Sequence, residues 1–423
     1  MALDPPVRAG AVLLSPAMAS LMLALLLGLQ PVTTDLMLTA LPALAAELHA
    51  PMAPVQRTLS ATLLAFGMAQ LAWGPVADRF GRRPVMLCGL AGYALASAGA
   101  TLAPSIDALV LWRAAQGAAM SASVVCARAM VRDLYEPHQG ASVMARALTG
   151  VGGLAVLCPA LGGWLVASFG WRSAPLLMMF AGIGLCALIV WRLPETIRQR
   201  DPNATRLRPL LRQVRTILRN PGFRAWTLML SCSYGALFFA LAGGGIVLIQ
   251  VLGVSAPQAG FLLSLLGCAY VCGTLLCRRW LPELGMTGSV RRAAALSLTA
   301  GLLLAGMAAA EPHSLWALML PMALFAVGHG VHQPCSQIGA VAAFPQAAGL
   351  ASALAGFALA VVAFGVGTWL GATLDGSSLR PLAGGMAAGA CASALVAWTL
   401  VRRHGEPGPA PASTGRMAAK RLA

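Results

Sequence analysis

The sequence predicts an all-α polytopic membrane protein with twelve transmembrane helices in two six-helix bundles. Its composition is the first reason: 58% of the 423 residues are hydrophobic and 10% are charged, with a mean hydropathy of +0.77. A soluble globular chain of this length does not need so much apolar surface. The second reason is that apolar runs of roughly 20 residues recur along the chain. The third is that basic residues gather in alternate connections between these runs.

Twelve runs are long enough to cross a bilayer as helices. The first six are Ala17–Leu41, Val55–Ala77, Pro84–Leu102, Ala108–Val131, Ala141–Ser168 and Ser173–Trp191. The second six are Phe223–Leu252, Gln258–Cys277, Ala293–Ala310, Leu315–Gln337, Ala347–Leu374 and Pro381–Val401. Because the first run can span the bilayer and many others follow it, we expect no cleavable signal segment.

The run pattern divides the chain into four parts. We expect an N-terminal six-helix bundle over residues 1–191 and a C-terminal bundle over residues 223–404. A basic linker, 192–222, joins them, and a Pro-, Ala- and Ser-rich tail, 405–423, is expected to be disordered. The amphipathic stretch Leu207–Leu218 suggests that the linker lies on an anionic membrane surface. A binding site for a partner is the alternative interpretation of that stretch.

The basic residues predict the topology. All but four of the 29 Lys and Arg residues fall on one side of the twelve-span scheme, the exceptions being Arg57, Arg113, Arg172 and Arg380. Positive loops stay in the cytoplasm, so both termini and the linker of this multi-pass protein are predicted to be cytoplasmic. Topology also accounts for the net charge of +16, so we expect no nucleic-acid partner.

The ten cysteines all lie in apolar segments or at their ends, and no Cys-x-x-Cys pair occurs. Buried apolar cysteine is the ordinary role for such residues, so we expect no metal site and no structural disulfide.

A short basic turn between the second and third runs has the sequence G-P-V-A-D-R-F-G-R-R-P-V-M-L, from Gly74 to Leu87. Gly74 and Gly81 are expected to permit close backbone approach and turn geometry. Asp78 falls at a helix end, where its charge can reach Arg82. Arginines alone would fit an ordinary positive loop. The spacing Gly-x-x-x-Asp-Arg-x-Gly-Arg-Arg, which also includes Arg79, is more specific and resembles the signature loop of the major facilitator superfamily.

One acid and one base fall inside the predicted spans. Asp35 lies in the first run, where a charge costs several kcal/mol unless it is paired, hydrated or neutralised. Arg113 lies at a similar depth in the fourth run, so the two are predicted to be partners in proton coupling. The alternatives are that Asp35 reaches the outer surface, and that the two form a static ion pair holding two helices together.

Further motifs extend the resemblance. The stretch L-W-R-A-A-Q-G, with Arg113, Gln116 and Gly117, resembles the superfamily's fourth-helix motif. The stretch L-C-P-A-L-G-G-W resembles the antiporter motif of drug exporters at Pro159, Gly162 and Gly163, although Cys158 and Leu154 replace glycines of that pattern.

Together with V-T-T-D-L-M-L-T-A-L-P-A-L, R-A-M-V-R-D-L-Y and G-L-A-S-A-L-A-G, these motifs resemble the Bcr/CflA branch of drug/H+ antiporters. The resemblance is strong in the first half and looser in the second. It implies an inner-membrane exporter that exchanges drugs for protons, with a cavity lined by spans 1, 4, 7 and 10. It also implies that Asp78, Arg82 and Asp133 form a cytoplasmic charge relay that steadies the outward-open state.

Polar and aromatic residues of those four spans are candidates for substrate contact: Gln30, Thr34, Gln116, Tyr234, Phe238, Phe239, His329 and Gln333. Aromatic walls suit varied apolar ligands. Aromatic side chains at helical spacing also pack helices together, and His329 and His332 can equally serve packing, so both interpretations stay open.

We therefore expect a monomeric, proton-coupled exporter of drugs or similar small amphipathic molecules. Its partners are the substrate, protons and the lipid bilayer, with the proton as coupling ion and no cofactor. The alternative within the same fold is an exporter or importer of a natural metabolite such as an amino acid or a purine. A membrane enzyme would need a polar catalytic cluster that the sequence lacks, and a channel would not need the titrating acid.

Overall fold

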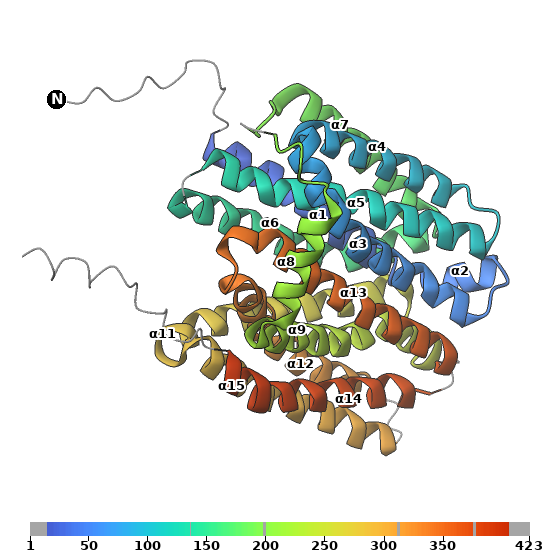
Figure 1. The fold of residues 1–423 in the computed structure, drawn as a ribbon. Coiled ribbons are helices and arrows are strands. Elements are labelled where there is room, and N and C mark those ends of the chain that lie inside the picture. Colours follow the sequence, from blue (N-terminus) through green and yellow to red (C-terminus); the bar gives the residue numbers. More distant parts are fainter. Residues whose placement is uncertain (1–14, 136, 198–199, 311–313, 375–377, 406–423) are drawn as a thin grey trace, which may run out of the picture.

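The computed structural model describes residues 15–135, 137–197, 200–310, 314–374 and 378–405. These residues form helices and short connections, without a strand (Figure 1). Eleven helices are long and apolar enough to cross a membrane. One of them, α11 (Ala256–Ala309), has 54 residues and a non-helical backbone at Gly285. At roughly 1.5 Å per residue it is about twice as long as a bilayer requires. It therefore makes two passes, and the predicted all-α fold with twelve passes is confirmed.

Seven helices precede the linker. They are α1 (Pro16–Asp35), α2 (Leu41–Glu47), α3 (Met52–Phe80), α4 (Arg82–Thr101), α5 (Ile106–Leu134), α6 (Pro137–Phe169) and α7 (Ser173–Arg192). Among these, α5 packs against α3 and α4, α4 also packs against α7, and α1 packs against α6. The short α2 is not a membrane pass.

The first predicted span was drawn too long. Instead of continuing to Leu41, α1 ends at Asp35, and the next five residues form tight turns before α2 begins. Backbone hydrogen bonds between residues three apart, such as Met37 to Thr34 and Leu38 to Asp35, replace the helical pattern. Leu36, Met37 and Leu38 are fully buried by the protein, so the hydropathy signal continues past the helix end.

The linker contains one helix, α8 (Leu207–Arg219), which packs against α9 and α13. It crosses the direction of the long helices in Figure 1. Ile217 is buried, whereas Leu207, Leu211 and Leu218 are exposed together with the arginines of the helix. The structure therefore gives the predicted amphipathic basic stretch a helical form.

The second half begins with a span that is interrupted by π-helical turns. It runs through α9 (Pro221–Phe238), η1 (Phe239–Gly243), α10 (Gly244–Ile246) and η2 (Val247–Val251). After α11 follow α12 (Leu315–Ala342), η3 (Pro345–Ala347), α13 (Ala348–Thr373), α14 (Arg380–Val396), η4 (Ala397–Val401) and α15 (Arg402–His404). Here α9 packs against α12, α13 and α14, and α11 packs against α12 and α14.

The connection between predicted spans 8 and 9 is largely helical. The backbone stays helical from Cys277 to Arg292 except at Gly285, where φ is 63° and ψ is −176°. A glycine adopts this positive φ at little steric cost, so one residue suffices to turn the chain.

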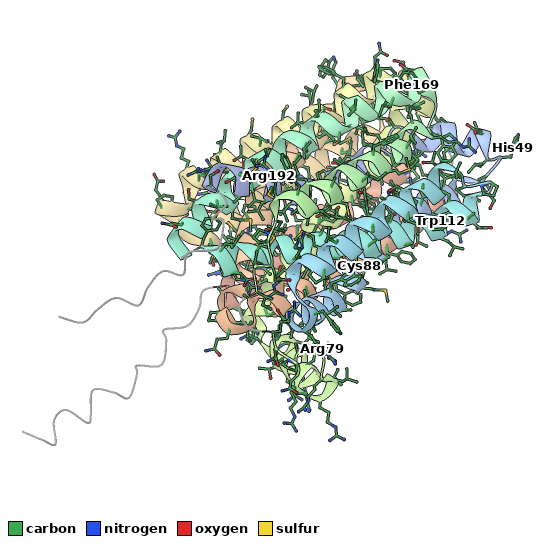
Figure 2. All side chains as sticks on the ribbon, turned by 90° about the horizontal axis from the view of Figure 1, so that it is seen from above. His49, Arg79, Cys88, Trp112, Phe169 and Arg192 are labelled. Atoms are coloured by element: carbon green, nitrogen blue, oxygen red, sulfur yellow. The ribbon has the colours of Figure 1, made fainter. Side chains whose placement is uncertain are left out.

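The long helices have two distinct ends. Figure 2 shows Arg79 and Arg192 toward one end and His49 and Phe169 toward the other. We refer to these as the basic end and the opposite end. The disordered tail predicted over residues 405–423 lies, after Gly405, outside the described residues.

The two groups of helices meet along α3 with α13 and α6 with α11. Small residues make these contacts possible, because they let backbones approach closely. At Gly163 the backbone of α6 lies against Ala256 of α11, and at Gly367 α13 lies against Ser60 of α3.

Candidate functional site

Arg113 on α5 is fully buried and holds the end of α1. Its Nη2 donates to the carbonyl oxygen of Thr33 at 2.8 Å, and its Nη1 donates to Oε1 of Gln116 at 2.5 Å. Gln116 in turn donates through Nε2 to Ser97 Oγ on α4 at 2.6 Å. The Thr33 hydroxyl is hydrogen-bonded to that of Tyr93, also on α4, at 2.7 Å. This network joins α1, α4 and α5 inside the first half.

Asp35 lies at the last residue of α1, close to both halves of the protein. Its Oδ1 accepts a hydrogen bond from the hydroxyl of Thr34 at 2.7 Å. Three residues later, the backbone of Leu38 lies against Gly245 of the second half. Asp35 is therefore next to the junction where the second half meets the first.

The predicted pairing of Asp35 with Arg113 is not present in this structure. None of the ion pairs between described residues includes Asp35 or Arg113. Helix geometry explains the difference: at about 100° per residue, the side chains of Thr33 and Asp35 leave α1 on nearly opposite sides. The guanidinium reaches the Thr33 side, and the carboxylate points away from it.

The α6 motif lies directly against this end of α1. Gly162 touches the backbone of Leu36, the residue after Asp35, and Gly163 touches Ala256 at the start of α11. Pro159 lies against Gly260 of α11. The three motif residues thus bring α1, α6 and α11 together beside Asp35, which agrees with the expected close packing.

Three of the predicted substrate contacts come together in the second half. The rings of Tyr234 and Phe238 are stacked with centroids 6.1 Å apart, and Tyr234 lies 6.2 Å from His329. Phe239 does not join them, since it packs edge-on against Trp369 of α13 at 5.3 Å. Its role is helix packing, the alternative left open by the sequence.

The remaining candidates are more scattered. Gln116 belongs to the Arg113 network. Thr34 lies beside Asp35, and its hydroxyl, which has one proton, can donate either to Asp35 or to the carbonyl oxygen of Gln30 at 3.0 Å. Gln30 and Gln333 are half-buried, which leaves part of each side chain available to a ligand.

A second polar site lies at the basic end. Arg82, at the start of α4, bonds to Asp78 of α3 at 2.6 Å and to Asp133 of α5 at 3.2 Å. The structure thus brings together the three residues of the predicted charge relay. They border an open cavity of about 570 Å³ whose lining also includes Arg132, Tyr135 and Asp201.

Glu195, in the connection after α7, is a member of this cluster that sequence reasoning missed. Its carboxylate accepts hydrogen bonds from the backbone N–H groups of Arg82 at 2.9 Å and Arg83 at 3.3 Å. It thereby caps the start of α4, where free N–H groups and the helix dipole favour an anion. The next residue, Thr196, donates to Asp133 at 3.3 Å. In the sequence, only the position of this acid shortly after a span could have indicated such a role.

The two glycines of the basic turn differ. Gly81 has φ 111° and ψ 154°, which only glycine adopts readily, and it lies against Glu195. Gly74 has nothing within 4 Å of the space that a Cβ would occupy. The expected close approach at Gly74 is therefore wrong, because it lies inside α3 facing open space. Arg79 points away from the relay and bonds to Thr205 of the linker at 2.7 Å.

Comparison with protein families matches residues 23–368 to the Major Facilitator Superfamily. This match spans most of the chain. The chain belongs to this superfamily. It is therefore a transporter rather than an enzyme, as the sequence predicted. Within the described residues, no group of three or more His, Cys, Asp or Glu side chains could hold a metal ion.

Three curated relatives agree with the Bcr/CflA-type resemblance. Multidrug resistance protein D of Escherichia coli is 32% identical over 336 residues, covering 79% of this chain and 84% of that protein. The bicyclomycin resistance protein homolog of Haemophilus influenzae is 29% identical over 390 residues, covering 91% and 96%. The chloramphenicol resistance protein of Pseudomonas aeruginosa is 30% identical over 335 residues, covering 76% and 75%. The predicted branch is thus confirmed.

Solved structures agree on the fold. A D-xylose–proton symporter superimposes with a TM-score of 0.71 at 15% identity, covering 91% of this chain and 97% of that one. A bacterial homolog of the human lysosomal transporter Spinster, in an inward-facing conformation, gives 0.66 at 16% identity, with coverages of 94% and 96%.

Proposed function

We propose that this transporter exports drugs or similar small amphipathic molecules across a bacterial inner membrane in exchange for protons. The names of the relatives, which refer to multidrug, bicyclomycin and chloramphenicol resistance, support drug efflux. A natural metabolite remains the alternative substrate, but no contact in the structure favours it. The basic end then faces the cytoplasm, as the arginine distribution requires.

The position of Asp35 is the observation that supports proton coupling. It is a carboxylate at the junction of the two halves, outside every ion pair of the described residues, and next to the close contact between α1 and Gly162. A carboxylate in such a place is expensive to keep charged without a partner. Movement of the halves would change its access to water, so proton binding and conformation would be coupled.

We assign Arg113 a positioning role in this mechanism. It bonds to the Thr33 carbonyl oxygen, two residues before Asp35, and is itself oriented by Gln116. The guanidinium thus satisfies a backbone acceptor close to the end of α1. We propose that it sets the place of Asp35 through the backbone and does not neutralise the carboxylate.

A ligand would lie between the Asp35 region and the aromatic rings of the second half. Tyr234 contacts Phe238 and His329. Such a wall combines apolar faces with a few polar groups, which suits small amphipathic molecules. At the basic end, the Asp78–Arg82–Asp133 cluster would close the cytoplasmic side and stabilise one of the two alternating states.

The experiment is a drug panel on a bacterium that lacks its own efflux pumps. Wild-type protein should raise the minimum inhibitory concentration of at least one drug. Asp35→Asn should not, whereas Asp107→Asn, which changes an exposed acid of α5, should protect like the wild type. If membrane-inserted wild-type protein protects against none of the drugs, drug export is refuted. If Asp35→Asn protects as well as the wild type, Asp35 is not the coupling acid.

A further inference from the structure

One serine hydroxyl bridges two histidine rings inside the second half. Ser233 Oγ on α9 lies 2.8 Å from Nδ1 of His329 and 3.0 Å from Nδ1 of His332, both on α12. All three side chains are buried, with exposed fractions of 0%, 1% and 0%. This cluster lies next to the aromatic wall, because Tyr234 follows Ser233 in the chain and its ring lies 6.2 Å from that of His329.

The bridge requires the two neutral rings to differ. A serine hydroxyl has one proton to donate, so it can donate to one Nδ1 only. The other ring must donate its own Nδ1–H to the serine oxygen. Nε2 of His332 has no hydrogen-bond partner among the described residues, so either ring can be the one that donates to the serine oxygen. One ring carries its proton on Nδ1 and the other carries it on Nε2. The ring with the Nδ1 proton keeps a free lone pair on its own Nε2.

The surroundings of the pair contain few other titratable groups. Tyr234 of α9 and Tyr270 of α11 lie against His329, the latter at 5.9 Å between ring centroids. Cys335, on the next turn of α12, pairs with Cys277 of α11. From the other helices that pack on α9, α13 supplies no titratable residue, and α14 supplies the exposed Cys391 and, at its first residue, Arg380. The other two, α8 and α15, supply exposed arginines and the exposed His404. None of the ion pairs between described residues includes either histidine.

We propose that Ser233, His329 and His332 form a second proton-carrying site of the transporter, one that holds a single proton between two imidazoles. This inference rests on the proposed proton-coupled function and adds to Asp35 a site in the opposite half. A proton binds the free Nε2 lone pair of the ring that donates to the serine. The Nδ1 proton of that ring then moves to the serine oxygen as the serine proton moves to Nδ1 of the other ring. The hydroxyl is restored, the first ring is neutral again, and the second ring carries the charge.

The closed surroundings make this proton binding dependent on conformation. A buried imidazolium without an acidic partner is costly, so the pair is neutral in the present arrangement. When the cavity opens to water, the cost of the charge falls and a proton can bind. A second proton would place two positive charges on rings that share one hydroxyl, so the site holds one proton at most.

NMR can determine which nitrogen of each histidine ring carries the proton. The full-length protein with ¹⁵N-labelled histidine is studied by NMR at neutral pH, and the His329→Gln and His332→Gln variants assign the two signals. We expect one ring in the Nδ1–H form and the other in the Nε2–H form. Two Nε2–H rings, unchanged by Ser233→Ala, would refute the bridge.

Measurements of proton transport test whether the Ser233–His329–His332 site carries a proton during transport. In inverted vesicles, the rate of drug-driven proton release by the wild type should depend on pH through two ionisations. Ser233→Ala should lose one of them, and Ser233→Thr, which keeps a hydroxyl, should restore it. Ser231→Ala is the matched control, since this serine is also buried on α9 and its hydroxyl bonds to no described residue. If the wild type releases no protons, the proposed function fails. If it does and Ser233→Ala has the wild-type profile, only the second site fails.

Discussion

Gly81→Ala and Gly74→Ala should have opposite effects although both glycines belong to one motif. Gly81 ends α3 and precedes α4 with φ 111° and ψ 154°. An alanine there must adopt a backbone conformation that is essentially restricted to glycine, at a cost of about 1–3 kcal/mol. Its methyl group would also meet the carboxylate of Glu195.

The second part of the cost comes from the cap that Glu195 provides. Displacing this carboxylate weakens its hydrogen bonds to the N–H groups of Arg82 and Arg83, at 2.9 and 3.3 Å. Hydrogen bonds to charged groups contribute about 1.5–3 kcal/mol when buried, and the half-exposed position of Glu195 reduces this to roughly 1 kcal/mol. Gly81→Ala should therefore destabilise the protein by about 3 kcal/mol. Gly74→Ala meets open space inside α3, so it should stabilise by roughly 0.5–1 kcal/mol.

The assay is thermal unfolding of both purified variants in the same detergent, followed by size-exclusion chromatography of the heated samples. Gly81→Ala should lower the midpoint by several degrees, while Gly74→Ala should equal or exceed the wild type. Equal losses in the two variants would refute the reasoning, because they would mean that the backbone conformation and the Glu195 contact do not distinguish the two positions.

Three further outcomes follow from single contacts. Asp133→Asn removes one of the two carboxylates on Arg82 and should destabilise the state in which this cluster is formed by about 1 kcal/mol. Spin-label distances across the basic end should then show a roughly fivefold population shift; an unchanged distribution would contradict it. Arg113→Lys should reach the membrane but lose transport, since an ammonium cannot keep the fork to Gln116 and Thr33; a normal drug export rate would contradict it. Gln56→Leu removes the 3.0 Å bond to the Ala242 carbonyl oxygen, so the two halves should separate more often at the opposite end. A cysteine placed at that end should then be labelled faster, and an unchanged labelling rate would show that this bond does not hold the halves together.

The sequence predicted structure well where the membrane restricts the positions that a residue type can take. Hydropathy and arginine positions gave the twelve passes, because lipid leaves a chain few choices. The basic turn was recognisable because its acid and arginines cannot lie in hydrocarbon, and the structure joins Asp78, Arg82 and Asp133 as predicted.

The sequence was less informative where the direction of a side chain decides the contact. Depth in the membrane made Asp35 and Arg113 look like partners, but the rotation between Thr33 and Asp35 separates them. Glu195 was missed because its partners are backbone N–H groups of another helix, which leave no pattern in the sequence. The bridge made by Ser233 was missed for a similar reason, since it depends on how α9 and α12 face each other.

The most direct test of the central claim is drug-driven proton release by Asp35→Asn. Exchange of one proton for a neutral drug moves one charge inward, which is worth about 2.3 kcal/mol per 100 mV and supports a roughly fiftyfold drug gradient. Asparagine keeps the shape of the side chain but cannot ionise. In inverted vesicles with a pH-sensitive dye, wild-type protein should release protons when drug is added, and Asp35→Asn should release none while still binding drug. Release at the wild-type rate by Asp35→Asn would contradict the account.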